Sequence, residues 1–278
     1  MAEKKNSNLV VRVATAAVGI PGILALIYIA PPWGFYLLTL AASLVGTAEL
    51  FAMTHPGDRV SQVIGVLLGG AASAAVFFFH GDARVMATVL VAVPVLGPLL
   101  TLARLGDMSS AALRACAMGF GPLFVAVPIA MLALLRVDLG DPGGGYVLLA
   151  IGYAWMSDTG GYFAGRFLGK HKLYEAVSPK KTIEGSLGGL AAATAWSVIG
   201  HFTFAKSLPL VHAVVLALVA AALGQAGDLG ESLLKRSTGI KDSGQIVPGH
   251  GGMLDRIDAL ILTSAAVYLY TLWVRPIP

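Results

Sequence analysis

Residues 208–227 read LPLVHAVVLALVAAALGQAG, a stretch of twenty residues that contains no Asp, Glu, Lys or Arg. An α-helix of this length is about 30 Å long, which matches the hydrocarbon core of a bilayer. The next residues, 228–236, read DLGESLLKR, so acidic and basic groups follow directly where the apolar stretch ends. The sequence therefore predicts a membrane-spanning helix that carries charged groups to one membrane surface.

Eight further stretches of similar character occur along the chain. Of its 278 residues, 56% are hydrophobic and 12% are charged, whereas ordinary soluble domains carry about 25% charged residues. A soluble protein of this composition would expose large apolar patches and aggregate. The sequence therefore predicts an all-α, polytopic integral membrane helix bundle of about nine transmembrane helices, forming a single membrane domain over residues 1–278. The nine expected spans are 9–30, 33–53, 60–80, 85–104, 111–135, 145–165, 186–205, 208–227 and 257–275.

The positions of Lys and Arg predict how this bundle is oriented. Counting alternate loops, fifteen of these residues fall on the side of the N-terminus and four on the opposite side. This bias predicts a protein of the cytoplasmic (plasma) membrane, with its N-terminus in the cytoplasm and its C-terminus outside. Much of the excess lies in two loops, at about 166–185 and 228–256, so part of it reflects chemistry rather than topology. The basic residues form no long run, so nucleic acid is not an expected partner.

The two basic loops also hold most of the polar side chains of the chain, which divides it into two parts. Residues 1–140 are membrane helices of generic character, and residues 141–278 form the half that carries the motif loops. In the second loop, Asp228 and Glu231 are three residues apart, as are Asp255 and Asp258. Residues at this spacing share a helix face, and hard cations such as Mg²⁺ prefer carboxylate and phosphate oxygens. The alternative is that these acids form solvated salt bridges with nearby bases.

Basic side chains and glycines surround these acids. Lys and Arg suit phosphate oxygens, and glycines let backbone N–H groups approach an anion closely. A helix beginning near Met253 would aim its positive end at the same place. The loop therefore predicts a Mg–nucleotide phosphate site, although a lone loop histidine such as His250 is also commonly solvated, and Glu231 is expected in a solvated turn. The residues concerned are Lys235, Arg236, Lys241, His250, Gly251, Gly252 and Arg256.

The first loop offers a second anion-binding candidate. Residues 178–182 read SPKKT, so Ser178, Lys180 and Lys181 present hydroxyl and ammonium groups beside a stiff proline. They suit a lipid head group or a nucleotide phosphate, or they serve only as a positive-inside anchor. Asp158 lies inside an apolar stretch, where an acid is a functional candidate or a packing partner. Glu49, in the second apolar stretch, has no assigned role beyond a position near a helix end.

These motifs resemble the phosphatidate cytidylyltransferase family. The signature of that family begins Ser-x-x-Lys-Arg, continues with Lys-Asp and ends with His-Gly-Gly-x-x-Asp-Arg-x-Asp. Residues 232–236 (SLLKR), 241–242 (KD) and 250–258 (HGGMLDRID) match it in order and spacing. Residues 157–162 (SDTGGY) and 177–185 (VSPKKTIEG) look like upstream motifs of the same family. The matching segments lie in roughly the last 130 residues of the chain.

The resemblance implies a nucleotidyltransferase that transfers CMP from CTP to phosphatidate, giving CDP-diacylglycerol and pyrophosphate in phospholipid biosynthesis. It also implies Mg²⁺, with a monovalent cation such as K⁺ nearby, and a homodimer. Carried over by position, the resemblance implies metal binding by Asp228, Asp255 and Asp258, which also belong to the catalytic set with Lys235 and Arg236. It implies contacts with CTP or phosphatidate from Lys241, His250, Gly251, Gly252, Arg256, Ser178, Lys180 and Lys181.

Two other functions remain open from the residues alone. A CTP-dependent lipid-alcohol kinase of the polyprenol or phytol type would use a related nucleotide site but would release CDP. A non-enzymatic transporter would use Asp158 and Glu49 along its pathway. The concentration of polar residues in two same-side loops, rather than along the helices, favours an enzyme.

Overall fold

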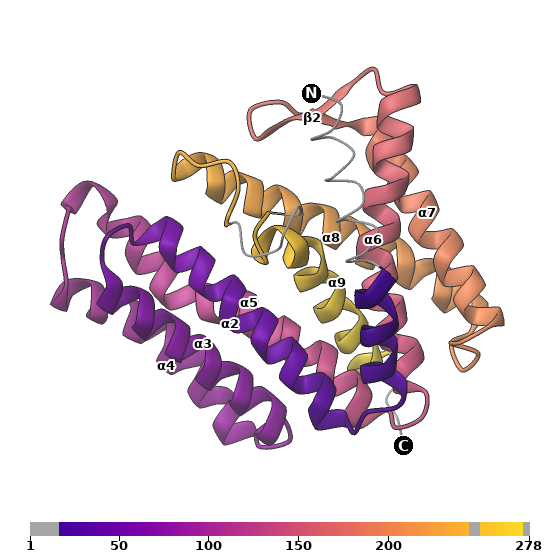
Figure 1. Ribbon diagram of the computed structural model, residues 1–278, viewed down its shortest axis with the longest axis horizontal. Coiled ribbons are helices and arrows are strands. Elements are labelled where there is room, and N and C mark those ends of the chain that lie inside the picture. The colour runs from indigo at the N-terminus through magenta and orange to yellow at the C-terminus, as the bar shows by residue number, and fades with distance from the viewer. Residues whose placement is uncertain (1–16, 245–250, 275–278) are drawn as a thin grey trace.

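The chain folds as a bundle of long helices with one short hairpin. The computed structural model describes residues 17–244 and 251–274, and the predicted all-α class is confirmed (Figure 1). Within the described residues the helices are Ala17–Tyr28, α2 (Pro32–Thr54), α3 (Arg59–Phe79), α4 (Ala83–Ala103), the short 3₁₀ helix η1 (Met108–Ser110), α5 (Ala111–Asp138), α6 (Gly143–Leu168), α7 (Ile183–Phe202), α8 (Leu210–Ser237) and α9 (Leu254–Trp273).

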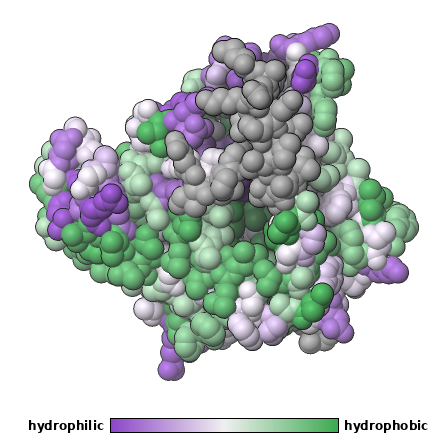
Figure 2. All heavy atoms as spheres, viewed as in Figure 1, coloured by the Kyte–Doolittle hydropathy of each residue, from purple (hydrophilic) through white to green (hydrophobic). Residues whose placement is uncertain are grey.

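Each predicted apolar stretch corresponds to one of the nine α-helices in the described residues. Five of these helices are long and apolar enough to cross a membrane, namely α2, α3, α4, α8 and the segment Met108–Asp138 that contains α5. Hydrophobic residues cover much of the face seen in Figure 2, and hydrophilic residues gather toward its margins. The chain is therefore an integral membrane protein, whereas the predicted count of nine spans stays a prediction.

The helices form two groups that meet along α8 and α9. Helices α2 to α5 lie together on one side, and α6 packs along α7 on the other (Figure 1). Helix α5 contacts α2, α3 and α4 within its own group and also reaches α6 and α9. Its side chains Leu134 and Leu135 are fully buried in the main core together with Leu149 and Tyr153 of α6. This shared core fixes the C-terminal helices relative to the N-terminal ones.

Small residues allow α6 and α7 to approach closely. At Gly188 of α7, an added Cβ atom would overlap the Cβ of Ala164 and lie 3.1 Å from the carbonyl oxygen of Gly160. Helix α7 begins after Thr182, whose hydroxyl accepts a hydrogen bond from the backbone N–H of Gly185 at 3.1 Å, an N-cap interaction. The close packing and the cap together place the start of α7 beside the end of α6.

A small antiparallel hairpin connects α6 to α7, in a segment for which the sequence predicts a loop. Strand β1 (Lys172–Tyr174) pairs with β2 (Ser178–Thr182). Glu184, in the first turn of α7, accepts hydrogen bonds from the backbone N–H groups of Lys170 and His171 at 3.1 and 3.2 Å. The His171 side chain also hydrogen-bonds to Glu184 at 2.6 Å and, with these N–H groups, holds the pKa of the carboxyl at about 2. The hairpin is thus anchored at the base of α7.

Candidate functional site

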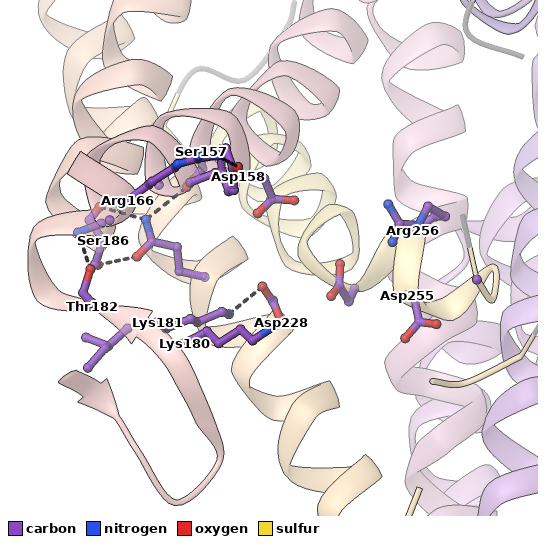
Figure 3. Close-up of a pocket in the computed structure, with 18 of the residues that line it drawn as sticks. Ser157, Asp158, Arg166, Lys180, Lys181, Thr182, Ser186, Asp228, Asp255 and Arg256 are labelled. Carbon is purple, nitrogen blue, oxygen red and sulfur yellow. Dashed lines mark hydrogen bonds and ion pairs between the residues drawn. The ribbon is translucent and has the colours of Figure 1, made fainter. Parts of the chain in front are cut away.

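The two motif loops meet at one cavity of about 900 Å³. Its walls come from the last turns of α6, strand β2, the start of α7, the polar end of α8 and the start of α9 (Figure 3). Within the described residues the charged side chains that line it are Asp158, Arg166, Lys180, Lys181, Asp228, Lys235, Asp242, Asp255, Arg256 and Asp258. The cavity therefore collects charged groups from segments that lie far apart in the sequence.

Lys181 and Asp228 form an ion pair across this cavity. The Lys181 Nζ lies 2.5 Å from the Asp228 Oδ2, and both side chains are about three-quarters buried. Lys181 projects from β2, and Asp228 projects from α8 at the point where its apolar stretch ends (Figure 3). The pair joins the first motif loop to the second, which neither loop predicts alone.

Lys235 holds two further acids together. Its Nζ lies 2.7 Å from the Glu231 Oε2 and 2.6 Å from the Asp255 Oδ1. Glu231 is 3% exposed, so the expectation that it sits in a solvated turn is wrong. Helix α8 continues to Ser237, beyond its apolar stretch, and packs against α9. Glu231 is buried in this packed region, and the Lys235 ammonium one helical turn away offsets part of the cost of burying its carboxylate.

Three carboxylates, those of Asp158, Asp228 and Asp258, line the same cavity. The charge of Asp228 acts on both of the other two, and the charge of Asp158 acts on Asp258. Asp158, which the sequence left without a firm role, thus belongs to the same cluster. Like charges held together in this way favour a bound cation.

The donor set of this cluster suits Mg²⁺ once a phosphate is present. Among residues 17–244 and 251–274, no three His, Cys, Asp or Glu side chains converge closely enough to form a complete metal site by themselves. Mg²⁺ is commonly held by only one or two carboxylates, with waters and substrate phosphates completing its shell. Asp228 and Asp258 supply such carboxylates at the cavity wall, so the residues fit the ion that the sequence predicts.

Asp255 is held by backbone groups in addition to Lys235. Its Oδ2 accepts hydrogen bonds from the N–H groups of Ser243 and Gly252, both at 3.1 Å. Gly251, which also lines the cavity, has a φ of +87° that favours glycine. Gly251 and Gly252 therefore belong to the turn before α9 that supports the Asp255 carboxylate.

A polar network in the wall of the cavity links three helices. The Gln225 Nε2 donates to the Ser157 Oγ and to the Ser186 carbonyl oxygen, both at 3.0 Å. The Ser186 hydroxyl donates to the Gln225 Oε1. These residues belong to α8, α6 and α7, respectively. The sequence analysis missed them, although a single Gln inside an apolar stretch was the available signal.

Several residues predicted for the site lie elsewhere in the structure. The Arg236 guanidinium donates to the carbonyl oxygens of Val177 at 3.4 Å and Ile240 at 3.3 Å, so it ties the hairpin to the end of α8. Ser178, Lys241 and Gly252 also do not line the cavity formed by the described residues. His250 falls outside the described residues. Their predicted contacts with CTP or phosphatidate stay predictions.

The fold and the cavity define a polytopic helical membrane protein whose charged site is built from helix ends and strand β2. The chain belongs to the cytidylyltransferase family, whose model matches residues 10–274. This confirms the family resemblance that the motifs indicate.

Curated relatives agree with this assignment. The chain is similar to the phosphatidate cytidylyltransferase of Bacillus subtilis, with 40% identity over 131 residues, which cover 47% of this chain and 49% of the relative. It is 44% identical over 116 residues to that of Staphylococcus haemolyticus, covering 42% and 45% of the two chains. It is 38% identical over 130 residues to that of Synechocystis, covering 47% and 44%. The aligned part thus spans less than half the length of each relative.

Proposed function

We propose that this protein is a phosphatidate cytidylyltransferase, which transfers CMP from CTP to phosphatidate and releases pyrophosphate. Its family and the printed names of its relatives support this reaction. The single observation that carries the proposal is the charge balance of the cavity. Five acidic and five basic side chains line it within the described residues. A cavity of this kind suits a substrate that brings phosphates and a cation together, rather than a bare anion or a bare cation.

The reaction needs two anions to meet. An oxygen of the phosphatidate phosphate attacks the α-phosphorus of CTP, the new P–O bond forms, and the bond from the α-phosphorus to the bridging oxygen breaks as pyrophosphate leaves. The attacking oxygen is already anionic, so the reaction does not require a strong general base. The barrier lies in charge repulsion and in charge that develops at phosphorus, which positioned cations lower.

The basic residues of the cavity lie on two sides of it, where they would contact the phosphates of both substrates. Lys180 and Lys181 project from β2, and Arg256 projects from the start of α9 on the opposite side (Figure 3). Phosphates placed between these elements would be held from both sides. Lys181 would exchange its contact with Asp228 for a phosphate oxygen, which would leave the carboxylate open to a cation.

Asp228 and Asp258 are the residues that would hold Mg²⁺, with Asp158 as a further oxygen donor on the same wall. When bound, Mg²⁺ would neutralise phosphate charge and polarise the phosphorus centre. Asp255 is engaged by Lys235 and two backbone N–H groups, so within this set it positions the loop before α9. A monovalent cation such as K⁺ beside Mg²⁺ is implied by the family resemblance alone.

The proposal also includes the orientation of the protein in the membrane and its oligomeric state. The cavity and the N-terminus would face the cytoplasm, where CTP is available, and the membrane would supply phosphatidate at its surface. Labelling a cysteine introduced at Lys170, in a background that carries Cys116→Ala, with a membrane-impermeant maleimide would test this side. The homodimer implied by the family resemblance would be tested by measuring the mass of the purified protein in detergent.

The first test is pyrophosphate release by the purified protein in detergent with CTP, phosphatidate and Mg²⁺, with the lipid products followed in parallel. The expected result is pyrophosphate matched by CDP-diacylglycerol. Asp228→Asn should abolish the transfer, because it removes a cation ligand and the partner of Lys181. Glu175→Gln is the matched control, since it removes one negative charge from the exposed turn of the hairpin.

Two results would contradict the proposal. CDP release with phosphorylation of a supplied lipid alcohol would identify a lipid-alcohol kinase that uses the same nucleotide site. Full activity in the Asp228→Asn variant would refute the assignment of the cavity, even if the wild-type protein makes CDP-diacylglycerol.

A further inference from the structure

The N-terminal helices contribute one buried acid to the turn that precedes α9. Glu49 lies in α2 and is 5% exposed. Its Oε2 accepts hydrogen bonds from the Ser243 hydroxyl at 2.9 Å and the Leu254 N–H at 2.8 Å, and its Oε1 accepts one from the Met253 N–H at 3.0 Å. Burying a carboxylate is costly unless hydrogen bonds satisfy it. Among the described residues, these donors lie just before α9 or at its first residue, about 200 residues further along the chain.

Ser243 connects this acid to the candidate active site. Its hydroxyl donates to Glu49 and lies 3.4 Å from the backbone nitrogen of Asp255, while its own backbone N–H donates to the Asp255 carboxylate at 3.1 Å. Gly252, directly before Met253, supplies the second backbone donor to that carboxylate at 3.1 Å. Glu49 therefore fixes both backbone segments whose N–H groups orient Asp255.

The space around the Glu49 carboxylate is closed by two glycines. An added Cβ atom at Gly244 would overlap the Glu49 Oε1. One at Gly252 would overlap the Ser243 hydroxyl and lie 2.6 Å from the Glu49 Oε2. Only residues without a Cβ fit at these two positions while the carboxylate stays in place. Gly244 and Gly252 are thus fitted closely around Glu49, and this acid does more than occupy a helix end.

Apolar packing keeps the two helices in register around this contact. Leu50 and Met53 of α2 and Leu254, Ile257 and Ile261 of α9 belong to one buried hydrophobic cluster. These residues lie next to the Glu49 contact in both helices, so small sliding motions of α2 against α9 would break apolar contacts. The Glu49 hydrogen bonds consequently have a rigid frame.

We propose that Glu49 is a positioning residue for the transfer reaction, acting through Ser243 and the first turn of α9 to hold the Asp255 carboxylate and, through Asp255, the Lys235 ammonium at the cavity. The proposal rests on the proposed function for its activity readout. It assigns the N-terminal half of the chain a direct part in the site, since α2 supplies the residue that holds the catalytic segment.

The test compares Glu49→Gln and Glu49→Asp with the wild-type protein. Glu49→Gln keeps the size of the side chain but places an NH₂ group where at least one backbone N–H already points. Loss of a residue that orients a functional side chain commonly lowers activity by about 10-fold to 100-fold, and we expect a loss of this size. The half-saturating Mg²⁺ concentration should also rise, because the charges beside the cation site are no longer held in place. Glu49→Asp keeps the charge and should recover part of the activity.

Thr47→Val is the matched control, since it alters a buried polar residue on the same helix without touching the segment before α9. It should leave turnover and the Mg²⁺ dependence at the wild-type level. A purely structural role for Glu49 would lower the amount of folded enzyme in both variants equally without moving the Mg²⁺ dependence, and that outcome would overturn the proposal.

Amide hydrogen exchange separates this proposal from the proposed function. Exchange across residues 251–258 should be faster in Glu49→Gln than in the wild type, whether or not the protein turns over CTP. If the wild-type protein is inactive but exchange is still faster in Glu49→Gln, the proposed reaction is refuted, whereas the contact of Glu49 with the start of α9 is supported. Unchanged exchange, or faster exchange together with normal turnover and Mg²⁺ dependence, would overturn the positioning role.

Discussion

Replacing Lys235 with Met should destabilise the protein strongly, because one ammonium group serves two carboxylates. The side chains of Lys235, Glu231 and Asp255 are 12%, 3% and 10% exposed. Removing one partner of a buried ion pair costs about 3–5 kcal/mol. Asp255 would keep its two backbone donors, so most of the cost falls on Glu231. We therefore expect Lys235→Met to lose about 3 kcal/mol of unfolding free energy, the lower end of that range.

Unfolding in detergent micelles, followed by the loss of helical circular dichroism, would measure this difference. The decisive comparison is the double variant Lys235→Met/Glu231→Gln. It removes the charge that Lys235→Met leaves unpaired, so it should be more stable than Lys235→Met alone. The difference in unfolding free energy between Lys235→Met and the wild type should also decrease as the pH falls, since Glu231 can then take up a proton. Lys241→Met, on an exposed loop residue, is the control and should change stability by less than about 0.5 kcal/mol.

Two outcomes would refute this reasoning. If the unfolding free energy of Lys235→Met equals that of the wild type, the ammonium group does not hold the two acids together. If the double variant is no more stable than Lys235→Met, the cost does not come from an unpaired Glu231. In that case the cost would come from the lost ion pair between Lys235 and Asp255.

Two further predictions concern the first motif loop and its frame. The partners of Glu184 lower its pKa from 4.5 to about 2. The stability that they provide should therefore be complete above pH 4.5 and disappear as the pH falls through about 2. The hydrogen-exchange rates of residues 170–182 in the wild type and in Glu184→Gln should become equal at that pH, and a difference that stays constant with pH would contradict the anchoring role of Glu184. Gly188→Ala should cost about 1–3 kcal/mol through overpacking against α6, whereas Gly230→Ala, where no atom lies within 4 Å of the added Cβ, should not destabilise; equal unfolding midpoints would contradict close packing of α6 and α7.

Hydropathy predicted the helices well because burial in lipid imposes a requirement on every residue of a span. It predicted their ends less well, and α8 shows why. The apolar stretch ends at residue 227, but the helix continues to Ser237, because its polar end packs against α9 and lines the cavity rather than lying in lipid. Local hydropathy reports the bilayer, so it does not record packing of this second kind. The hairpin was missed for the same reason, since its short charged strands carry no apolar pattern.

The motif loops were identified correctly as parts of one site, but the ion pairs between their elements were not predictable. Spacing places Lys235 one helical turn from Glu231 on α8, whereas Lys181, the partner of Asp228, lies on β2, and Asp255, the second partner of Lys235, lies on α9. These two pairs depend on how β2 and α9 pack against α8. Arg236 illustrates the limit, because it matches the family signature but donates to backbone carbonyl oxygens outside the cavity.

Glu49 marks the boundary between what a sequence shows and what packing adds. In the sequence it is one acid in an apolar stretch, and nothing nearby could satisfy its charge. In the structure its donors are a hydroxyl and two N–H groups that have no intrahelical acceptor at the start of α9. Each side thus needs the other, since the carboxylate lacks local donors and the helix end lacks local acceptors. An unexplained acid in one half of a membrane protein therefore directs the search toward uncapped helix ends in the other half, where burial makes such pairing obligatory.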